Sequence, residues 1–186
     1  MTEVYIFLAD GFEEIEGLTV VDLLRRAGVP IQMVSISESR KVKGSHGIEI
    51  TADLLFDEID ANAAQMFVLP GGMPGTTHLA EHAGLAELLK EQAAAGKKIA
   101  AICAAPTVLG GLGLLKGHQA VCYPGLEDAL TGAHTTENPV EICGNITTSR
   151  GMGTAIPFGL ALVAQLRSQE AADQLAKSIV FPAGNK

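Results

Sequence analysis

The chain has 186 residues, of which 47% are hydrophobic and 4% aromatic, and its formal net charge is −8. This length and hydrophobic content suit one domain with a substantial core, and we expect residues 1–186 to form it. The negative charge and the lack of a basic run argue against general binding to nucleic acid or an anionic membrane. No apolar stretch is long enough to span a bilayer, and the first residues do not resemble a signal peptide.

The three cysteines are an odd number, are widely spaced and include no C-x-x-C pair. From this pattern we expect neither a disulfide framework nor a structural zinc site. Free thiols are typical of a reducing compartment, so we predict a cytoplasmic protein.

Short apolar runs alternate with segments of helical periodicity along the whole chain. In chain order we expect a strand at 4–9, a helix from 15 that Gly28 ends, a strand at 31–36, a hairpin at 42–53, a strand at 66–69, a helix at 77–95, a strand at 98–102, a helix at 106–112, strands at 120–123, 140–142 and 146–149, and helices at 156–166 and 170–180.

This alternation predicts an α/β fold, a doubly wound and mainly parallel sheet between two layers of helices. Ligands bind such a sheet beyond the carboxyl ends of its strands. Three segments of this chain follow predicted strand ends, at 10–16, 70–75 and 103–106. These segments therefore hold the candidate functional residues.

The sequence A-A-I-C-A-A-P at 100–106 places Cys103 between a buried strand and a helix with Pro106 in its first turn. Small neighbours permit a sharp turn, and the positive end of a helix dipole favours a thiolate. We therefore expect a reactive thiol with a lowered pKa. The alternative interpretation is a buried cysteine that packs as a small apolar side chain.

Two other segments supply possible partners for this thiol. Gly71 and Gly72 follow a strand, where paired glycines let the backbone approach a ligand, and the N–H groups of Gly72 and Ala104 could jointly hold an oxyanion. Glu13 suits the first turn of a helix by complementing its dipole. Glu16 instead falls near an apolar face, where a carboxylate needs a partner or a proton.

Taken together, the segments resemble the ThiJ/PfpI superfamily and, within it, the DJ-1 branch. The resemblance covers nearly the whole chain and rests on four motifs in the same order: D-G-F-E-E-I-E at 10–16, L-P-G-G-x-x-G at 69–75, A-A-I-C-A-A-P at 100–106 and T-S-R-G-M-G-T at 148–154. It implies a flavodoxin-like three-layer sandwich that forms a homodimer. The intracellular protease branch, with His after the cysteine, fits less well because this chain has Ala104 there.

The resemblance also implies roles for individual residues. Cys103 becomes the nucleophile, and Glu16 becomes the protonated carboxyl that hydrogen-bonds its thiolate. The oxyanion and substrate-binding positions are then Gly71, Gly72, Ala104, Glu13, Tyr123 and His46. Two of these differ from the usual residue, because Tyr123 stands where relatives often have His and His46 stands where they often have Arg.

The function implied is cysteine-dependent chemistry on small reactive carbonyls, without cofactor or metal. Methylglyoxal or glyoxal would be converted to lactate or glycolate, as by a glyoxalase III, and deglycation of proteins would use the same groups. The alternative is a redox-responsive stress protein or chaperone in which Cys103 is oxidised to a sulfinic acid. A third function given to such chains, thiazole-phosphate biosynthesis, finds no phosphate-binding signature here.

Overall fold

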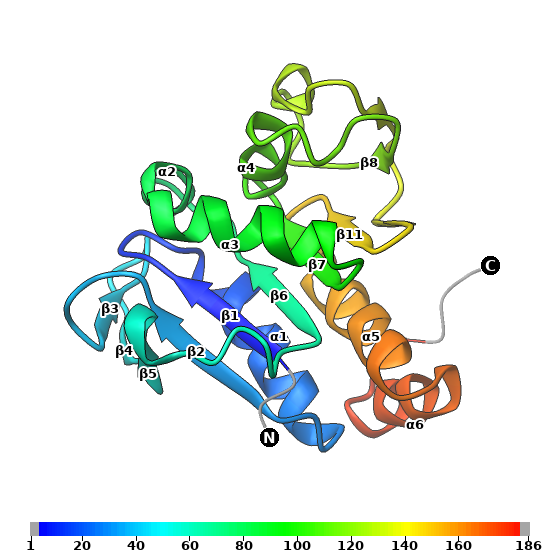
Figure 1. Cartoon of the computed structure of the whole chain (residues 1–186). Coiled ribbons are helices and arrows are strands. Elements are labelled where there is room, and N and C mark those ends of the chain that lie inside the picture. Colours follow the sequence, from blue (N-terminus) through cyan, green and yellow to red (C-terminus); the bar gives the residue numbers. More distant parts are fainter. Residues whose placement is uncertain (1–3, 183–186) are drawn as a thin grey trace.

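A computed structural model of the protein describes residues 4–182. Residues 1–3 and 183–186 of the predicted domain lie outside the described part. The expectation about a signal peptide concerns residues 1–3 in part. The described residues build one seven-stranded sheet in the order β10-β11-β7-β6-β1-β2-β5 (Figure 1). Its strands are β1 (Val4–Leu8), β2 (Ile31–Ser35), β5 (Leu54–Leu55), β6 (Met66–Leu69), β7 (Lys98–Ile102), β10 (Val140–Cys143) and β11 (Ile146–Ser149).

Six α-helices accompany this sheet within residues 4–182: α1 (Glu14–Arg26), α2 (Gly75–Glu81), α3 (Ala83–Ala94), α4 (Pro106–Gly111), α5 (Ala155–Leu166) and α6 (Gln169–Ser178). All neighbouring strands of the sheet run parallel except β10, which is antiparallel to β11. The predicted flavodoxin-like α/β fold with a mainly parallel sheet is therefore confirmed.

The alternation of side chains along β1 explains the two helical layers. Val4, Ile6 and Leu8 belong to the core that contains the buried faces of α1, α5 and α6. Tyr5 and Phe7 belong to the core on the other face, which includes the buried side chains of α2, α3 and α4. Because successive residues of a strand point to opposite faces, an apolar run without polar interruption is what a sheet covered on both faces requires.

Shorter elements extend this frame. The predicted hairpin is confirmed as the antiparallel pair β3 (Lys41–Lys43) and β4 (Glu49–Thr51). A separate parallel pair joins β8 (Gln119–Ala120) to β9 (His134–Thr135), and single 3₁₀ turns form at η1 (Phe56–Glu58), η2 (Glu127–Ala129) and η3 (Met152–Thr154).

Three expectations were wrong in detail. The helix expected at 77–95 is two helices, because His82 leaves helical geometry and its Nδ1 accepts the backbone N–H of Leu85 as the N-cap of α3. The strand expected at 120–123 ends at Ala120 and lies outside the main sheet. The apolar face of α1 is also shifted, since Ile15 is 50% exposed.

The strand order places the candidate residues at one edge. The chain leaves β1 toward β2 on one side, whereas β6 and β7 lie on the other side of β1, so the winding direction changes beside β1. Because β1, β6 and β7 are parallel, the segments that follow them meet at their carboxyl ends, where open α/β sheets bind ligands.

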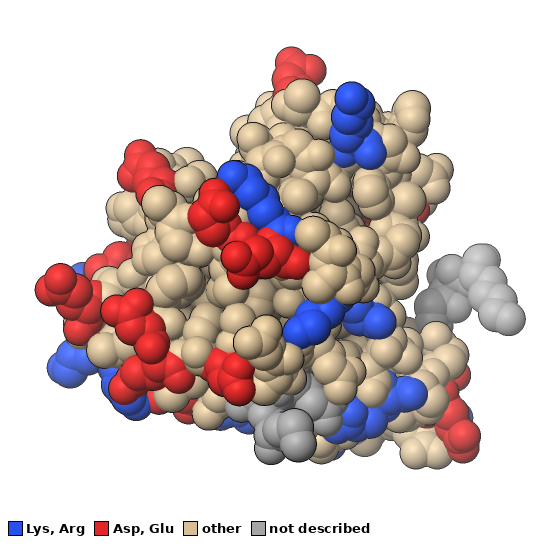
Figure 2. All heavy atoms as spheres, in the orientation of Figure 1, with Lys and Arg blue, Asp and Glu red and all other residues tan. Residues whose placement is uncertain are grey.

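The surface agrees with the acidic composition. On the face drawn in Figure 2, basic side chains are scattered among acidic ones and do not gather into a broad basic area. Within residues 4–182, none of the helices has both the length and the apolar character needed to cross a bilayer.

Candidate active site

Cys103 occupies the turn between β7 and α4 that the sequence predicts. Its φ of +66° lies in the left-handed region, which is unusual for a residue with a side chain and is typical of strained nucleophile turns. The turn is fixed from both sides, because the Cys103 N–H donates to the carbonyl of Ser149 (2.9 Å) and its own carbonyl accepts the N–H of Tyr123 (2.8 Å). Pro106 takes the first turn of α4, as expected.

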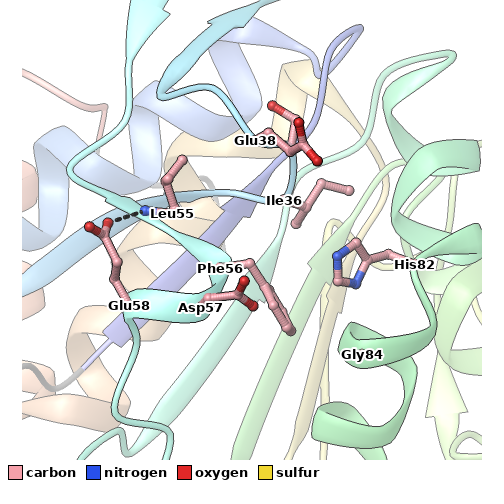
Figure 3. A pocket seen from close by; sticks show the side chains of 9 residues that line it. Ile36, Glu38, Leu55, Phe56, Asp57, Glu58, His82 and Gly84 are labelled. Atoms are coloured by element: carbon pink, nitrogen blue, oxygen red, sulfur yellow. Dashed lines mark hydrogen bonds between the residues drawn. The ribbon is translucent and has the colours of Figure 1, made fainter.

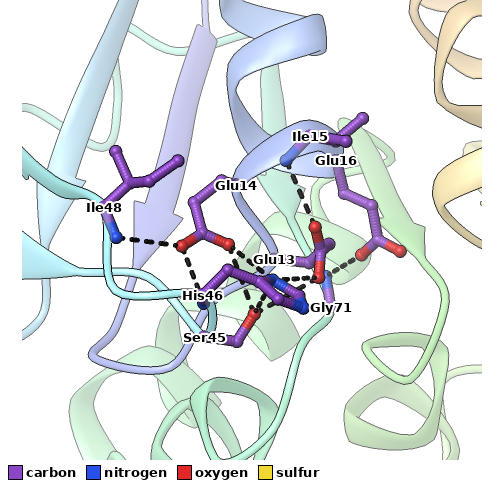
Figure 4. A network of polar contacts seen from close by, with 8 residues as sticks. All are labelled: Glu13, Glu14, Ile15, Glu16, Ser45, His46, Ile48 and Gly71. Atoms are coloured by element: carbon purple, nitrogen blue, oxygen red, sulfur yellow. Dashed lines mark hydrogen bonds and ion pairs between the residues drawn. The ribbon is translucent and has the colours of Figure 1, made fainter.

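Glu16 reaches the same turn from α1. Its side chain is buried, with 1% exposed, and its Oε2 accepts the N–H of Gly71 at 2.9 Å (Figure 4). The carboxyl group is also hydrogen-bonded to the Cys103 side chain. A Cβ atom at Gly71 would lie 2.7 Å from Glu16 Oε2 and 2.7 Å from Cys103 Cβ, so only glycine leaves room for this pair.

The two predicted oxyanion donors act on the sulfur. The backbone N–H groups of Ala104 and Gly72 both lower the pKa of the Cys103 thiol, against the effect of burial. Gly72 has a φ of +90°, and a Cβ there would lie 2.3 Å from the nitrogen of Glu13, so its backbone packs directly against the start of α1. Donors held in this way could stabilise negative charge on the sulfur or on a substrate oxygen beside it.

The electrostatics of the pair differ from the sequence expectation in one respect. Burial raises the pKa of Glu16 to about 7, against the lowering effect of its hydrogen bonds to Cys103 and Gly71. Burial also raises the pKa of the Cys103 thiol, to about 12, and the negative charge of Glu16 adds to this effect. The expectation of a lowered thiol pKa therefore fails while Glu16 is ionised, because two buried anions this close are costly.

The two groups consequently work as a unit. Burial raises the pKa of both groups, and each group acts on the ionisation of the other, so their protons are lost as a coupled pair. A thiol beside a carboxyl group has the chemistry that a nucleophile with an adjacent base requires.

A second polar network lies behind Glu16, at the contact of α1 with the β3–β4 hairpin (Figure 4). The Nδ1 atom of His46 lies 3.1 Å from Glu14 Oε2 and 3.3 Å from Glu13 Oε2, and Ser45 Oγ donates to both carboxylates. The hydrogen bond to Glu14 raises the pKa of His46, and the charge of Glu13 contributes. His46 therefore contacts acidic side chains of α1, and its link to Glu16 passes through Glu13, whose charge also raises the Glu16 pKa.

This network is also where the described residues bring metal-ligand side chains together. Ligand atoms of Glu13, Glu14 and His46 all lie within 4.8 Å of one another. Their facing atoms are engaged by one another and by Ser45, and the far oxygens accept backbone N–H groups of Ile15, His46 and Ile48. The hydrogen bonds of this network therefore connect α1 to the β3–β4 hairpin.

Glu14 is the group in this network that sequence reasoning missed. It is 4% exposed, although an acidic residue in a first helical turn is usually explained by the dipole alone. Burial acts to raise its pKa, but hydrogen bonds from its own N–H and from His46 and Ile48 outweigh burial and bring the pKa down to about 2.

We expect Glu14 to make the free energy of unfolding decrease at acidic pH. Since the pKa of Glu14 in the folded protein lies below its ordinary value of 4.5, its contribution to stability is complete above pH 4.5 and is lost as the pH falls toward 2. Urea unfolding at pH 7 and pH 3 should show a smaller loss of unfolding free energy in Glu14→Gln than in the unmodified protein. The exposed Glu87→Gln is the control, and an unchanged acid dependence in Glu14→Gln would contradict this account.

Tyr123 forms a wall beside the nucleophile. A Cβ at Gly151 would lie 3.5 Å from the Tyr123 ring and 3.9 Å from Cys103 Sγ, so the ring and the sulfur flank the same glycine. The ring is 53% exposed. Gly151, in the motif at 148–154, is a further residue at the site that the sequence did not single out by itself.

We expect Tyr123→Phe to retain most of any turnover at Cys103, with a loss below about tenfold, because the substitution removes one hydroxyl group and keeps the ring beside the sulfur. Steady-state kinetics with methylglyoxal would measure this loss beside that of Glu16→Gln. An equal or larger loss in Tyr123→Phe would move the proton transfer away from Glu16.

A larger pocket than the one beside Tyr123 lies elsewhere in the described residues. It has a volume of about 510 Å³ and is formed around β5, η1 and the start of α3, with Phe56 and His82 in ring contact at 4.4 Å (Figure 3). Glu58 on its rim is paired with Arg40 and caps the N–H of Leu55. None of the residues predicted for the site from the sequence lines this pocket.

Comparison with known proteins agrees with this geometry. A family model described as the DJ-1/PfpI family matches residues 2–165. Protein dj-1beta of Drosophila melanogaster is 34% identical over 177 residues, which cover 94% of this chain and 95% of that protein. Glutathione-independent glyoxalase DJR-1.2 of Caenorhabditis elegans is 34% identical over 169 residues, covering 90% and 89%. The chain spans only 40% and 45% of DJ-1 homologs B and A of Arabidopsis thaliana, to which it is 37% identical.

Solved structures show the same fold. Oxidized DJ-1 of Toxoplasma gondii superposes with a TM-score of 0.93 at 36% identity, covering 97% of this chain and 99% of that one. The C103A mutant of a DJ-1 superfamily protein from Salmonella typhimurium gives 0.92 at 34% identity, covering 98% and 100%. With the family model matched along most of its length, the chain belongs to the DJ-1/PfpI family.

Proposed function

We propose that the protein converts small 2-oxo aldehydes such as methylglyoxal and glyoxal into 2-hydroxy acids, without a cofactor. The observation that carries this proposal is the buried Glu16 carboxyl beside the half-buried Cys103 thiol, with the backbone N–H groups of Gly72 and Ala104 acting on the same sulfur. The family supports it, since one relative is named a glutathione-independent glyoxalase. Deglycation of proteins would draw on the same groups.

The reaction balances within these groups. The sulfur of Cys103 adds to the aldehyde carbon of methylglyoxal while Glu16 takes the thiol proton. The carbonyl oxygen, which accepts hydrogen bonds from Gly72 and Ala104, then receives this proton from Glu16 to give a hemithioacetal. The ionised Glu16 removes the proton from the former aldehyde carbon and delivers it to the neighbouring carbon, while the hydroxyl proton passes to the oxygen of that neighbour. The first carbon is thereby oxidised and the second reduced, which leaves a lactoyl thioester. Water hydrolyses this thioester, so methylglyoxal and water give lactate and the free thiol.

The test is product formation by the purified protein without glutathione. Proton NMR should show lactate appearing in equal amount to the methylglyoxal consumed, and glycolate from glyoxal. Consumption of methylglyoxal that yields only stable protein adducts, with no lactate, would contradict the proposal.

A redox role is the second candidate because the same pocket would hold an oxidised sulfur. The half-buried Cys103 is accessible to small oxidants, and the N–H groups of Gly72 and Ala104 with a protonated Glu16 could bind the oxygens of a sulfinate. A relative of known structure is described as oxidized. Retention of stress protection by a variant that has lost lactate formation would favour this role.

We further propose a homodimer. Ile15 is 50% exposed on α1, and Leu18 of the same helix shares a surface hollow with Ile156 of α5, which is 37% exposed, so apolar side chains of both helices reach the surface. Light scattering at micromolar concentration should give about twice 19.3 kDa, and Leu18→Arg should shift the mass toward the monomer. A monomeric unmodified protein would overturn this prediction.

The remaining proposals concern the setting of this activity. All three cysteines are free thiols, which supports the predicted cytoplasmic location. We treat residues 1–186 as one domain, as the single main sheet supports.

A further inference from the structure

The motif at 148–154 contains a residue that the proposed reaction does not use. Arg150 follows β11, whose last residue, Ser149, accepts the N–H of Cys103. The next residue, Gly151, passes close to the sulfur, since a Cβ there would be 3.9 Å from Cys103 Sγ. Arg150 is therefore attached to the backbone that borders the nucleophile.

A pocket of about 360 Å³ opens along this backbone and is lined by Tyr123, Pro124 and residues 150–154. Two of its side chains are exposed apolar groups, Tyr123 at 53% and Met152 at 51%. The Tyr123 N–H donates to the Cys103 carbonyl, and Gly151 lies beside the sulfur, so two of the residues that line this pocket also border Cys103.

Arg150 is the charged member of the pocket lining. The carboxylate of Glu127, whose charge also acts on Cys122, is not part of that lining. The Arg150 guanidinium donates to the carbonyl of Glu137 at 3.4 Å, and within residues 4–182 it has no carboxylate within 4.0 Å. Arg25, Arg26 and Arg40, by contrast, are paired with acidic side chains. Its charge also acts locally, since it lowers the pKa of Cys122, which burial raises to about 11.

The acidic groups of the site belong to a different wall. Glu13 and Glu16 come from the start of α1 and contact Gly71 through backbone or side chain (Figure 4). An anionic substrate is disfavoured near them but is favoured along the wall that carries Arg150. A substrate with one negatively charged end would therefore be oriented with that end toward Arg150 and away from Glu13 and Glu16.

We propose that Arg150 makes this pocket a specificity site for carbonyl substrates that carry a carboxylate, such as a 2-oxo aldehyde whose chain ends in a carboxyl group. The proposal rests on the proposed function in taking Cys103 as the group that attacks the carbonyl. The reacting oxygen lies at the N–H groups of Gly72 and Ala104, and the carboxylate binds the guanidinium, a match that arginine makes with two parallel hydrogen bonds.

The first experiment needs no enzymatic turnover. Iodoacetate and iodoacetamide alkylate a thiolate by the same displacement of iodide, and they differ chiefly in charge. The rates at Cys103, followed by peptide mapping, should show Arg150→Gln slowing iodoacetate by about three- to tenfold, as one lost charge at intermediate distance implies, while iodoacetamide changes less than about twofold. Lys90→Gln, an exposed helix residue paired with Glu87, makes the same change in net charge and should alter neither rate.

The second experiment tests substrate choice. With 4,5-dioxopentanoate, Arg150→Gln should raise KM by about three- to tenfold, and with methylglyoxal it should leave KM and kcat near their original values. Arg150→Lys should recover part of the effect because it retains the charge. Equal slowing of both alkylating reagents, or of both substrates, would mean that Arg150 only holds the loop and would overturn the proposal. Absence of turnover with both substrates would contradict the proposed function, and the alkylation ratio would still decide the role of Arg150.

Discussion

Replacing Cys103 by serine should abolish lactate formation, with a loss of at least about a thousandfold in kcat/KM, or about 4 kcal/mol of transition-state stabilisation. The substitution removes a single sulfur from a turn with φ of +66° and keeps a side chain of similar size there. A hydroxyl is a far weaker nucleophile than a thiol that Glu16 deprotonates, so the first covalent bond does not form. Lactate should be measured by NMR over several hours, so that a slow residual rate is detected.

The matched control is Cys122→Ser. Cys122 is buried, its pKa is raised to about 11 by burial and by the charge of Glu127, and its sulfur donates to the carbonyl of Tyr123. We expect this variant to retain activity within a few-fold, with circular dichroism unchanged in both variants. Lactate production by a folded Cys103→Ser at a rate comparable to the unmodified protein would exclude a covalent mechanism through this residue.

Most of the fold could be predicted because its strands are uninterrupted apolar runs. Each of the runs at β1, β6 and β7 is buried on both faces, which only a sheet covered by two helical layers satisfies. The break at His82 was not predictable from periodicity, since the apolar spacing continues through it and the break depends on a ring nitrogen that caps α3. The short strands β5 and β9 escaped prediction, and β8 was predicted only at Ala120, because two-residue strands are held by neighbouring segments and not by a pattern of their own.

The candidate site was predictable in its residues but not in its electrostatics. The spacing around Cys103 and the position of Glu16 on a buried face of α1 carry local signals, and the structure brings the two together as the sequence implies. The pKa of the thiol could not be read in this way, because it depends on how deeply both groups are buried and on the charge that Glu16 carries. Likewise, the burial of Glu14 follows from its contact with a hairpin more than thirty positions away, which local sequence does not reveal.

Replacing Glu16 by glutamine should separate the two functions of this carboxyl group. Glutamine keeps the size of the side chain and a hydrogen-bond donor, but it cannot accept the thiol proton or move a proton between substrate carbons. We expect kcat/KM for lactate formation to fall by about a hundred- to ten-thousandfold, the usual contribution of a positioned acid or base. Glu91→Gln, at an exposed position, serves as the control for the loss of one negative charge.

The thiol itself should become easier to ionise in Glu16→Gln. The negative charge of Glu16 and its hydrogen bond both raise the pKa of Cys103 toward about 12, so their removal should bring the thiolate transition to lower pH, although burial continues to oppose it. Ultraviolet titration of the thiolate would measure this shift directly. The variant should therefore alkylate at Cys103 as readily as the unmodified protein, or faster, while it fails to release lactate.

The pH dependence of the unmodified protein completes this argument. Because Glu16 has a pKa of about 7, the carboxylate that acts as base is present above neutrality and is lost as the pH falls below about 7. Turnover should thus decline on the acidic side with an apparent pKa near that value, and any residual activity of Glu16→Gln should lack this step. If Glu16→Gln instead formed lactate at the original rate and with the original pH profile, another group would be the base, and the redox role of Cys103 would become the better account of the pair.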